Sequence, residues 1–219
     1  MTDAPSNELF RHRQQPDGIH QENAPNRYFD SRVGMDVVMV LPGRHYVTDS
    51  SKEMLVTLLG SCVAACIRDP IAAVGGLNHF LLPESDNRHG QETINAAMRY
   101  GNYAMEILIN DIIKCGGARS RLEVKIFGGA HVIDGATALS IGQKNVDFVQ
   151  EYLKNEGIDV IASHLGGTLP RRIHYFPISG KVQMRQLQRA ADKDLFKKEM
   201  RYRSQIQIDG GGTDGELFD

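Results

Sequence analysis

Apolar residues in this chain gather in short runs that turn-forming residues separate, which is typical of a protein rich in β-strands. The runs at 36–41, 54–59 and 74–82 each end at glycine or proline and predict strands, the second of them buried on both faces. Residues 122–126 alternate between apolar and charged side chains, which predicts a half-buried strand. Further strands are predicted at 158–162, 173–178 and 181–184, the last two as a hairpin across Ser179 and Gly180.

A helical period replaces these runs in three places. From Glu92 onward, apolar residues recur at three- and four-residue steps or multiples of them until Gly116, which predicts a long amphipathic helix in which Gly101 marks a close contact. Residues 145–156 predict a second helix. Ser61 is a good N-cap, so residues 62–69 are predicted to form a short helix. This order of elements predicts a mixed α/β (α+β) fold with antiparallel pairs and longer crossovers.

Composition divides the chain into three parts. Residues 1–32 are polar and poor in aliphatic side chains, and we expect a disordered or loosely docked extension there. Residues 33–187 carry the apolar runs and form the predicted globular domain. Residues 188–219 predict a charged helical extension that ends in a flexible, glycine-rich tail.

Charge and composition exclude several classes of function. The 219 residues carry a net charge of −2, which gives no global field that favours nucleic acid or an anionic membrane. No apolar run approaches the ~20 residues that span a bilayer, so we expect no membrane insertion, and the N-terminal stretch lacks the apolar core of a signal peptide. The three cysteines argue against a disulfide framework, and the expected location is the reducing cytoplasm.

Cys62 differs from the other cysteines because it follows an apolar run and a Gly-Ser pair. This placement would lift its thiol to the end of a sheet, and the start of the predicted helix would favour the thiolate. The backbone N–H groups around Ser61, Cys62 and Val63 would then be able to donate to an oxyanion. His79 comes from the next apolar run, beside Asn78, and a thiol with a neighbouring imidazole is the minimum set for nucleophilic acyl chemistry.

Simpler explanations compete with this site. Cysteine is commonly an inert buried hydrophobe, which is the interpretation favoured for Cys66 and Cys115, and a histidine in an apolar strand is commonly a satisfied core residue. Thr57 could orient the imidazole of His79 or simply fill a strand. A metal held by Cys62, Cys66 and His79 lacks an evident fourth ligand, so we expect no metal.

Two stretches that carry these residues resemble a known family. TLLGSCVAACIRDP at 57–70 and GGLNHFLLP at 75–83 are similar to the signature of the CheD family, the chemoreceptor glutamine deamidases of bacterial chemotaxis. The similarity covers roughly residues 35–187 and continues through RYGNYAMEILINDIIKCGGARSRLEVKIFGGAHV, IGQKNVDFVQEYLKNEGI and LGGTLPRRIHYFPISGKVQMRQL. The polar stretch at 84–91 and both terminal extensions depart from the family pattern.

The resemblance implies hydrolysis of selected receptor glutamines to glutamates and, for some members, of receptor glutamyl methyl esters. It matches the family's nucleophilic cysteine to Cys62, its histidine to His79 and its catalytic threonine to Thr57. It implies a layered α/β sandwich similar to the catalytic domain of deamidating bacterial toxins, and a reaction that needs no cofactor. The implied partners are the cytoplasmic helical bundle of a chemoreceptor, as protein substrate, and in some bacteria a CheC-type phosphatase.

Two questions stay open at this point. Segments 127–131 (FGGAH) and 165–172 (LGGTLPRR) are either walls of a substrate groove or ordinary turns, and Arg171 and Arg172 either meet acidic receptor side chains or are solvated. The alternative function is a non-catalytic adaptor that docks a phosphatase or a receptor, and a third is methylesterase activity at the same site. The candidate groove residues are Asn78, Gly128, Gly129, Gly167 and Thr168.

Overall fold

The computed structural model describes residues 26–83, 90–132 and 136–188, which form two five-stranded sheets and two long helices. The helical elements are α1 (Gly90–Lys114), the short 3-10 helix η2 (Arg119–Arg121) and α2 (Ala136–Asn155). The strands are β1 (Asn26–Asp30), β2 (Met35–Met39), β3 (Arg44–Thr48), β4 (Glu53–Leu59), β5 (Val63–Asp69), β6 (Val74–His79), β7 (Glu123–Gly128), β8 (Val160–Leu165), β9 (Arg171–Phe176) and β10 (Lys181–Gln186). Sheet A has the order β1-β2-β4-β9-β10, and sheet B has the order β3-β6-β5-β7-β8.

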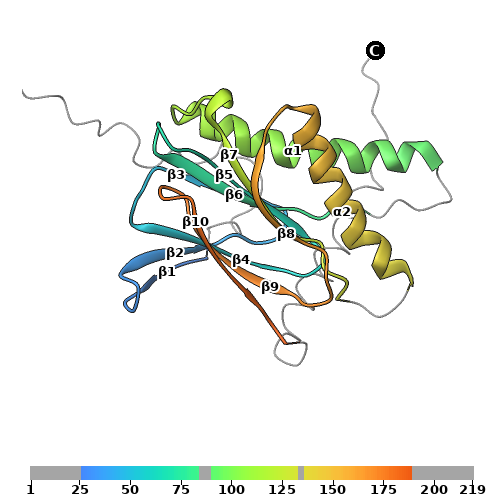
Figure 1. Cartoon of the computed structure of the whole chain (residues 1–219), viewed down its shortest axis with the longest axis horizontal. Helices are drawn as coiled ribbons and strands as arrows, with labels where there is room; N and C mark the ends of the chain where they lie inside the picture. Colours follow the sequence, from blue (N-terminus) through green and yellow to red (C-terminus); the bar gives the residue numbers. More distant parts are fainter. Residues whose placement is uncertain (1–25, 84–89, 133–135, 189–219) are drawn as a thin grey trace, which may run out of the picture.

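Sheet B lies between sheet A and the helix layer, as Figure 1 shows. The alternation along β5 reflects this position: Val63 and Ile67 pack in the cluster under α1 and α2, whereas Ala64 and Cys66 pack toward sheet A. Because both faces of β5 are covered, its sequence stays apolar without the polar alternation of a solvated strand. These three layers confirm the expected layered α/β sandwich, while the likeness to deamidating toxins stays a prediction.

Both sheets are mixed. Strands β2 and β4 run parallel, and so do β7 and β8, which α2 connects, whereas the other pairs are antiparallel. The predicted hairpin is confirmed as β9 and β10. The close contact expected at Gly101 is also confirmed, because a Cβ there would lie 2.5 Å from the ring of Phe148 on α2. Glycine therefore lets the two helices approach each other.

The short helix predicted at 62–69 is wrong, because these residues form β5, with Val63–Asp69 as its bounds. This strand pairs with β6 on one side and β7 on the other, so its backbone groups are satisfied by two neighbouring strands. Alanine by itself favours a helix, but this tertiary pairing overrides both that preference and the local capping signal of Ser61.

The folded region also starts earlier than the sequence suggested. Strand β1 lies inside the range expected to be an extension, where it pairs with β2, and Arg27 on it bonds the buried carboxylate of Glu53. Strand β3 was not predicted, and α2 begins at Ala136 rather than at residue 145. The expectations for residues 1–25 and 189–219, and for most of the polar stretch at 84–91, lie outside the described residues.

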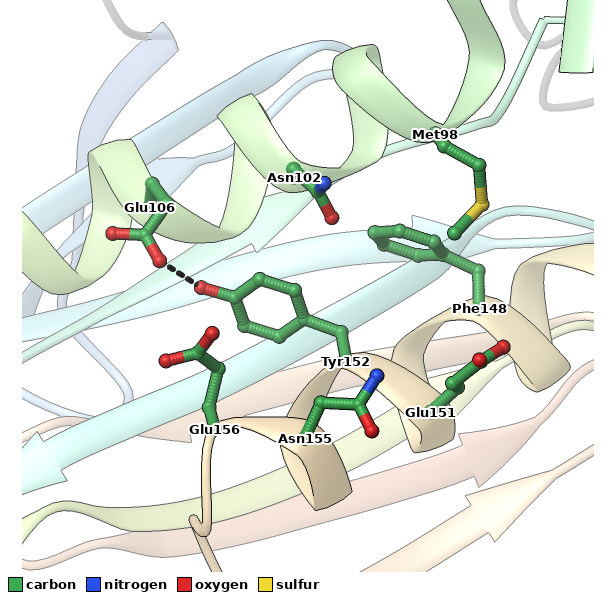
Figure 2. Close-up of a pocket in the computed structure, with 8 residues that line it drawn as sticks. All are labelled: Met98, Asn102, Glu106, Phe148, Glu151, Tyr152, Asn155 and Glu156. Atoms are coloured by element: carbon green, nitrogen blue, oxygen red, sulfur yellow. Dashed lines mark hydrogen bonds between the residues drawn. The ribbon is translucent and has the colours of Figure 1, made fainter. Parts of the chain in front are cut away.

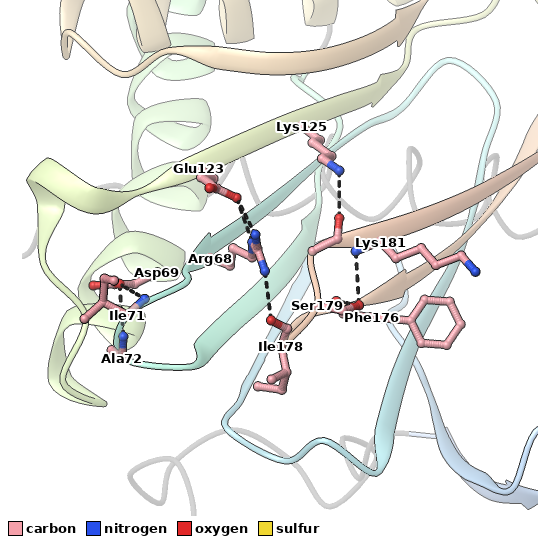
Figure 3. A network of polar contacts seen from close by, with 11 residues as sticks. Arg68, Asp69, Ile71, Ala72, Glu123, Lys125, Phe176, Ile178, Ser179 and Lys181 are labelled. Carbon is pink, nitrogen blue, oxygen red and sulfur yellow. Dashed lines mark hydrogen bonds and ion pairs between the residues drawn. The ribbon is translucent and has the colours of Figure 1, made fainter.

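Cationic side chains join the two sheets at the far end of β5 (Figure 3). Arg68 of sheet B donates to the carbonyl oxygen of Ile178 at 2.8 Å and is paired with Glu123, and Lys125 donates to the carbonyl oxygen of Gly180 at 2.7 Å. Ile178 and Gly180 belong to the turn between β9 and β10 of sheet A. These bonds therefore fix the sandwich at the end of β5 opposite to Cys62.

Candidate active site

Thr57 and His79 come from different sheets and meet in the core between them. Thr57 lies in β4 of sheet A, and His79 ends β6 in sheet B. Oγ1 of Thr57 lies 2.8 Å from Nδ1 of His79 and donates to the carbonyl oxygen of Val40 at 2.8 Å. Because the hydroxyl proton is used on Val40, the ring must donate its Nδ1–H to the threonine oxygen, which leaves the lone pair on Nε2.

Burial makes His79 a neutral base. Only 2 % of the residue is exposed, and this burial lowers its pKa to about 4, although a hydrogen bond with the backbone of Val40 opposes the shift. Nε2 is buried and has no hydrogen-bond partner among the described residues. A neutral imidazole whose second nitrogen is held in place presents one basic atom, as a general base requires.

Cys62 and His79 lie on the same face of sheet B. Val63 and Phe80 exchange two backbone hydrogen bonds of 3.0 and 2.9 Å, in the register that β5 and β6 keep farther along. Cys62 precedes the first residue of that pair and His79 precedes the second, so the two are diagonal neighbours across the ladder. Such neighbours have Cα atoms about 7–8 Å apart, within reach of longer side chains. The strand register therefore brings the thiol and the imidazole to one site.

All three candidate catalytic residues are covered. Cys62 and Thr57 are each 1 % exposed, close to the 2 % of His79. Solvent therefore has almost no access to these three side chains. Such a buried site also excludes water, so a charge that forms there interacts more strongly with its neighbours than it would in water.

Two arguments made for Cys62 from sequence are wrong. Cys62 precedes a strand, so the helix whose dipole was expected to act on its thiol is not present at 62–69. The N–H of Val63, expected to hold an oxyanion, donates to the carbonyl oxygen of Phe80. The oxyanion role expected of Ser61 stays a prediction.

The glycine pair at the end of β7, Gly128 and Gly129, supports the backbone of Cys62. Gly129 N–H donates to the carbonyl oxygen of Cys62, and Ala130 N–H donates to that of Gly60, both at 2.8 Å. A Cβ on Gly128, whose φ is +124°, would lie 2.1 Å from the carbonyl oxygen of Cys62. These glycines are needed because two backbones approach closely beside the candidate nucleophile.

The loop between β8 and β9 continues this support. Gly166 N–H donates to the carbonyl oxygen of Gly128 at 2.9 Å, and His131 N–H donates to that of Gly167 at 2.7 Å. The structure thus brings Gly128, Gly129 and Gly167 together around the turn that carries Cys62, and Gly167 and Thr168 are exposed beside it. Their role as walls of a substrate groove stays a prediction.

Arg171 is fully buried, which corrects the expectation that it is solvated or meets receptor carboxylates. It bonds the carbonyl oxygens of His164 and Gly166, and its Nη1 lies 2.8 Å from Nδ1 of His164. Burial lowers its pKa to about 10, so it stays charged at neutral pH. Its neighbour Arg172 is exposed. Sequence alone offered no signal that separated the two arginines.

Two buried asparagines lie near the site, and the sequence predictions misplaced or missed both. Asn78 was expected to line the substrate groove, but it faces the helix layer, where Nδ2 donates to the carbonyl oxygen of Ala104 at 2.8 Å. Asn145 is 0 % exposed on α2 and bonds both Ser61 and Leu82. A polar residue on the apolar stripe of a predicted helix was the available signal for Asn145.

The other cysteines do not join the site. Burial raises the pKa of the Cys66 thiol, which keeps it protonated, and Cys115 is exposed at the end of α1. None of the three cysteines forms a disulfide. No set of three or more potential metal-ligating side chains gathers in the part of the chain that the structure describes.

A separate pocket lies between α1 and α2 (Figure 2). Its volume is about 280 Å³, its lining includes Glu106, Phe148, Glu151 and Tyr152, and it contains none of the candidate catalytic residues. Tyr152 donates to Glu106 across it.

Neither of the two long helices, over the residues described, combines the length and apolar character needed to cross a membrane.

Comparison with known proteins identifies the family. The family model described as CheD chemotactic sensory transduction matches residues 81–186. A protein of Rhodopseudomonas palustris named "Probable chemoreceptor glutamine deamidase CheD" is 50% identical over 208 residues, which cover 94% of this chain and 96% of the relative. A protein of the same name from Saccharophagus degradans is 48% identical over 88% of this chain and 89% of its own length. A crystal structure of a Neisseria meningitidis protein of the DUF152 family matches with a TM-score of only 0.41 at 10% identity, over 63% of this chain and 66% of that one. On the sequence identity and coverage of these relatives, this chain belongs to the CheD family.

Proposed function

We propose that this protein hydrolyses the side-chain amides of selected chemoreceptor glutamines to glutamate and ammonia, with Cys62 as nucleophile. The observation that carries the proposal is the 2.8 Å contact between Thr57 Oγ1 and His79 Nδ1. This contact fixes the tautomer that leaves the lone pair on Nε2, and the register of β5 and β6 makes His79 a diagonal neighbour of Cys62. The names of the relatives supply the substrate class.

The reaction proceeds in two halves. His79 Nε2 takes the proton of Cys62, and the thiolate attacks the side-chain carbonyl carbon of a glutamine to form a tetrahedral intermediate. The imidazolium then gives that proton to the amide nitrogen, ammonia leaves and a thioester remains. A water molecule, deprotonated by Nε2, attacks the thioester, and the thiolate recovers the proton as glutamate is released.

The burial of His79 supports its part in these steps. A pKa of about 4 keeps the imidazole neutral in the resting site at neutral pH, so its Nε2 lone pair is free, and the thiolate formed beside it must stabilise the imidazolium that burial disfavours. The charged pair that forms on proton transfer lies in a water-poor core, where its two charges attract each other strongly. The hydroxyl of Thr57 keeps the ring orientation constant through both halves of the reaction.

The proposed substrate is a helical stretch of the receptor's cytoplasmic bundle, on the strength of the family resemblance. Each turnover replaces a neutral amide by a carboxylate and so adds one negative charge to a packed helix. This change alters the repulsion between neighbouring helices, which is a physical route to a shifted signalling state.

Mass spectrometry of a purified receptor fragment tests the proposal. Wild-type protein should convert glutamine to glutamate, Cys62→Ala and His79→Gln should not, and Cys115→Ala, which changes an exposed cysteine, should match wild type. Conversion by Cys62→Ala would show that the mechanism is wrong. If wild type converts no glutamine while it still binds the fragment, the adaptor function is supported instead.

Methylesterase activity is the second candidate, since a thiol and a neutral imidazole at one buried site also suit an ester carbonyl. Methanol released from a methylated receptor fragment, and lost in Cys62→Ala, would identify it. A CheC-type phosphatase as partner rests on the family resemblance, and co-purification of the two proteins tests it.

A further inference from the structure

Asn145 touches both segments that carry the proposed catalytic pair. Its Nδ2 donates to the carbonyl oxygen of Ser61 at 3.0 Å, and its Oδ1 accepts the backbone N–H of Leu82 at 2.8 Å. Ser61 immediately precedes Cys62, and Leu82 lies three residues after His79. Asn145 itself is completely buried on α2, so both bonds lie out of water.

The register of sheet B shows what these two bonds do. Val63 pairs with Phe80, so the next hydrogen-bonded pair of an antiparallel ladder would join Ser61 to Leu82 directly. Instead, the N–H of Leu82 bonds the side-chain oxygen of Asn145, and the side-chain nitrogen bonds the carbonyl of Ser61. The carboxamide is therefore inserted between the two strand ends. It holds the segment that carries Cys62 apart from the segment that follows His79.

A carboxamide fits this position without leaving an unsatisfied group. It supplies one donor to a carbonyl and one acceptor to an N–H, and both of those backbone groups belong to buried residues. A leucine would leave both groups without their partner or let them bond each other directly. Either result moves the turn that carries Cys62 relative to His79.

We propose that Asn145 is a positioning residue of the active site. Its inserted carboxamide keeps the Ser61 and Leu82 segments apart and so holds the Cys62 thiol in register with His79. The link to deamidation rests on the proposed function, whereas the effect on the Cys62 thiol does not. Asn145 is buried and does not contact solvent, so its loss should lower kcat and leave KM nearly unchanged. A misplacement of about 1 Å corresponds to a loss of about 100-fold in kcat.

The three cysteines provide the test, because each reports a different property under iodoacetamide. Cys115 is exposed and serves as the reference, whereas Cys62 and Cys66 are both buried and react only when their surroundings open, Cys66 when the core opens and Cys62 when the site opens. Alkylation of each is followed by mass spectrometry from pH 5 to 9 in wild type, Asn145→Leu and Asn145→Asp. The control for stability is Asp69→Asn at the other end of β5, where Asp69 binds Arg121 and three backbone N–H groups.

A positioning role predicts that Cys62 is alkylated more slowly relative to Cys115 in Asn145→Leu than in wild type, while Cys66 stays protected. Asn145→Asp keeps the acceptor for Leu82 and regains a donor when its carboxyl is protonated. Its Cys62 reactivity relative to Cys115 should therefore recover as the pH falls, which a merely structural role would not produce. This variant also carries the test if Asn145→Leu does not fold.

Two results would overturn the inference. Alkylation of Cys62 with the wild-type rate and pH profile in both variants would mean that Asn145 does not position the thiol. The second result is that the alkylation of both Cys62 and Cys66 rises in the Asn145 variants, and rises equally in Asp69→Asn when that variant loses the same stability. Asn145 would then only stabilise the fold. If wild type deamidates no receptor fragment but Cys62 reactivity still depends on Asn145, the proposed function fails and this inference stands.

Discussion

The guanidinium of Arg171 donates to the carbonyl oxygen of Gly166 and so ties the end of β9 in sheet A to the end of β8 in sheet B. Arg68 makes the corresponding link at the opposite end, to the carbonyl oxygen of Ile178. Within the described residues, the hydrogen bonds of Arg171 go to His164 and Gly166 and none goes to a carboxylate. A buried cation with two carbonyls and one imidazole nitrogen as partners is costly, so its position beside the site requires a structural reason.

Replacement of Arg171 by methionine should lower the free energy of unfolding by about 1–3 kcal/mol for each buried carbonyl that loses its donor. Deamidation should also fall, because Gly166 bonds Gly128, which packs on the carbonyl of Cys62. Urea denaturation and the receptor assay measure the two effects. Arg172→Met, at the exposed neighbour, is the matched control and should change neither quantity. If the two variants had the same free energy of unfolding and the same deamidation rate, Arg171 would not support the site.

Thr57→Val should lower kcat by about 100-fold, because the imidazole loses the acceptor that fixes its tautomer. Thr57→Ser keeps the hydroxyl and should retain most of the activity. Steady-state kinetics on a receptor fragment separates the two variants. Wild-type turnover by Thr57→Val would mean that the threonine only fills β4, which is the simpler explanation that the sequence left open.

Stability should fall as the pH drops from 6.5 to 4, because His79 stays neutral in the folded protein down to about pH 4 while the unfolded chain already takes up a proton near pH 6.5. The pKa of His79 is lower in the folded protein than in the unfolded chain. Its contribution to the free energy of unfolding is therefore fully present above pH 6.5 and is lost on acidification, on the order of 3 kcal/mol in total. Urea denaturation from pH 7 to 4.5 measures it. His79→Gln should show a smaller loss across the same range; an equal loss would place the effect on other groups.

Gly128→Ala should be severely destabilising and inactive, because its Cβ would lie 2.1 Å from the carbonyl oxygen of Cys62. Gly166→Ala is the informative control, since Gly166 also has a positive φ, of +69°, but has open space where its Cβ would be. This control should cost only about 1 kcal/mol through backbone strain. Thermal unfolding and deamidation of both variants test whether the close approach, rather than the turn itself, requires glycine.

The sequence identified the catalytic candidates for partly wrong reasons. Cys62 and His79 were expected to lie close together, and the register of β5 and β6 supports this, but the helix invoked to activate Cys62 is a strand. Local signals cannot separate the two, since Val63–Asp69 is short and apolar on both faces, and only its pairing with two strands selects the extended form. The residues alone left two roles open for Thr57, and the resemblance to the family favoured the one in which it contacts His79.

The supporting residues could not be predicted, because their roles depend on contacts between distant segments. Asn145 bonds Ser61 from 84 positions away, and Arg171 and Arg172 look alike until the sheet assigns one to the core and one to solvent. Strand β3 was missed because RHYVT is short and half polar, and it exists only through its pairing with β6. Long-range pairing of this kind leaves no periodic signal in the local sequence.

The 1 % exposure of Cys62 has a consequence for the lifetime of the protein outside its reaction cycle. A thiol activated by a neighbouring base is also a target for peroxide, which converts it to sulfenic acid and then to forms that cells cannot reduce. The cover that a glutamine must displace also keeps small oxidants from the resting thiol, so Cys115, which is exposed, should oxidise before Cys62. Docking of a substrate would then open the nucleophile and, for that interval alone, leave it vulnerable to oxidation.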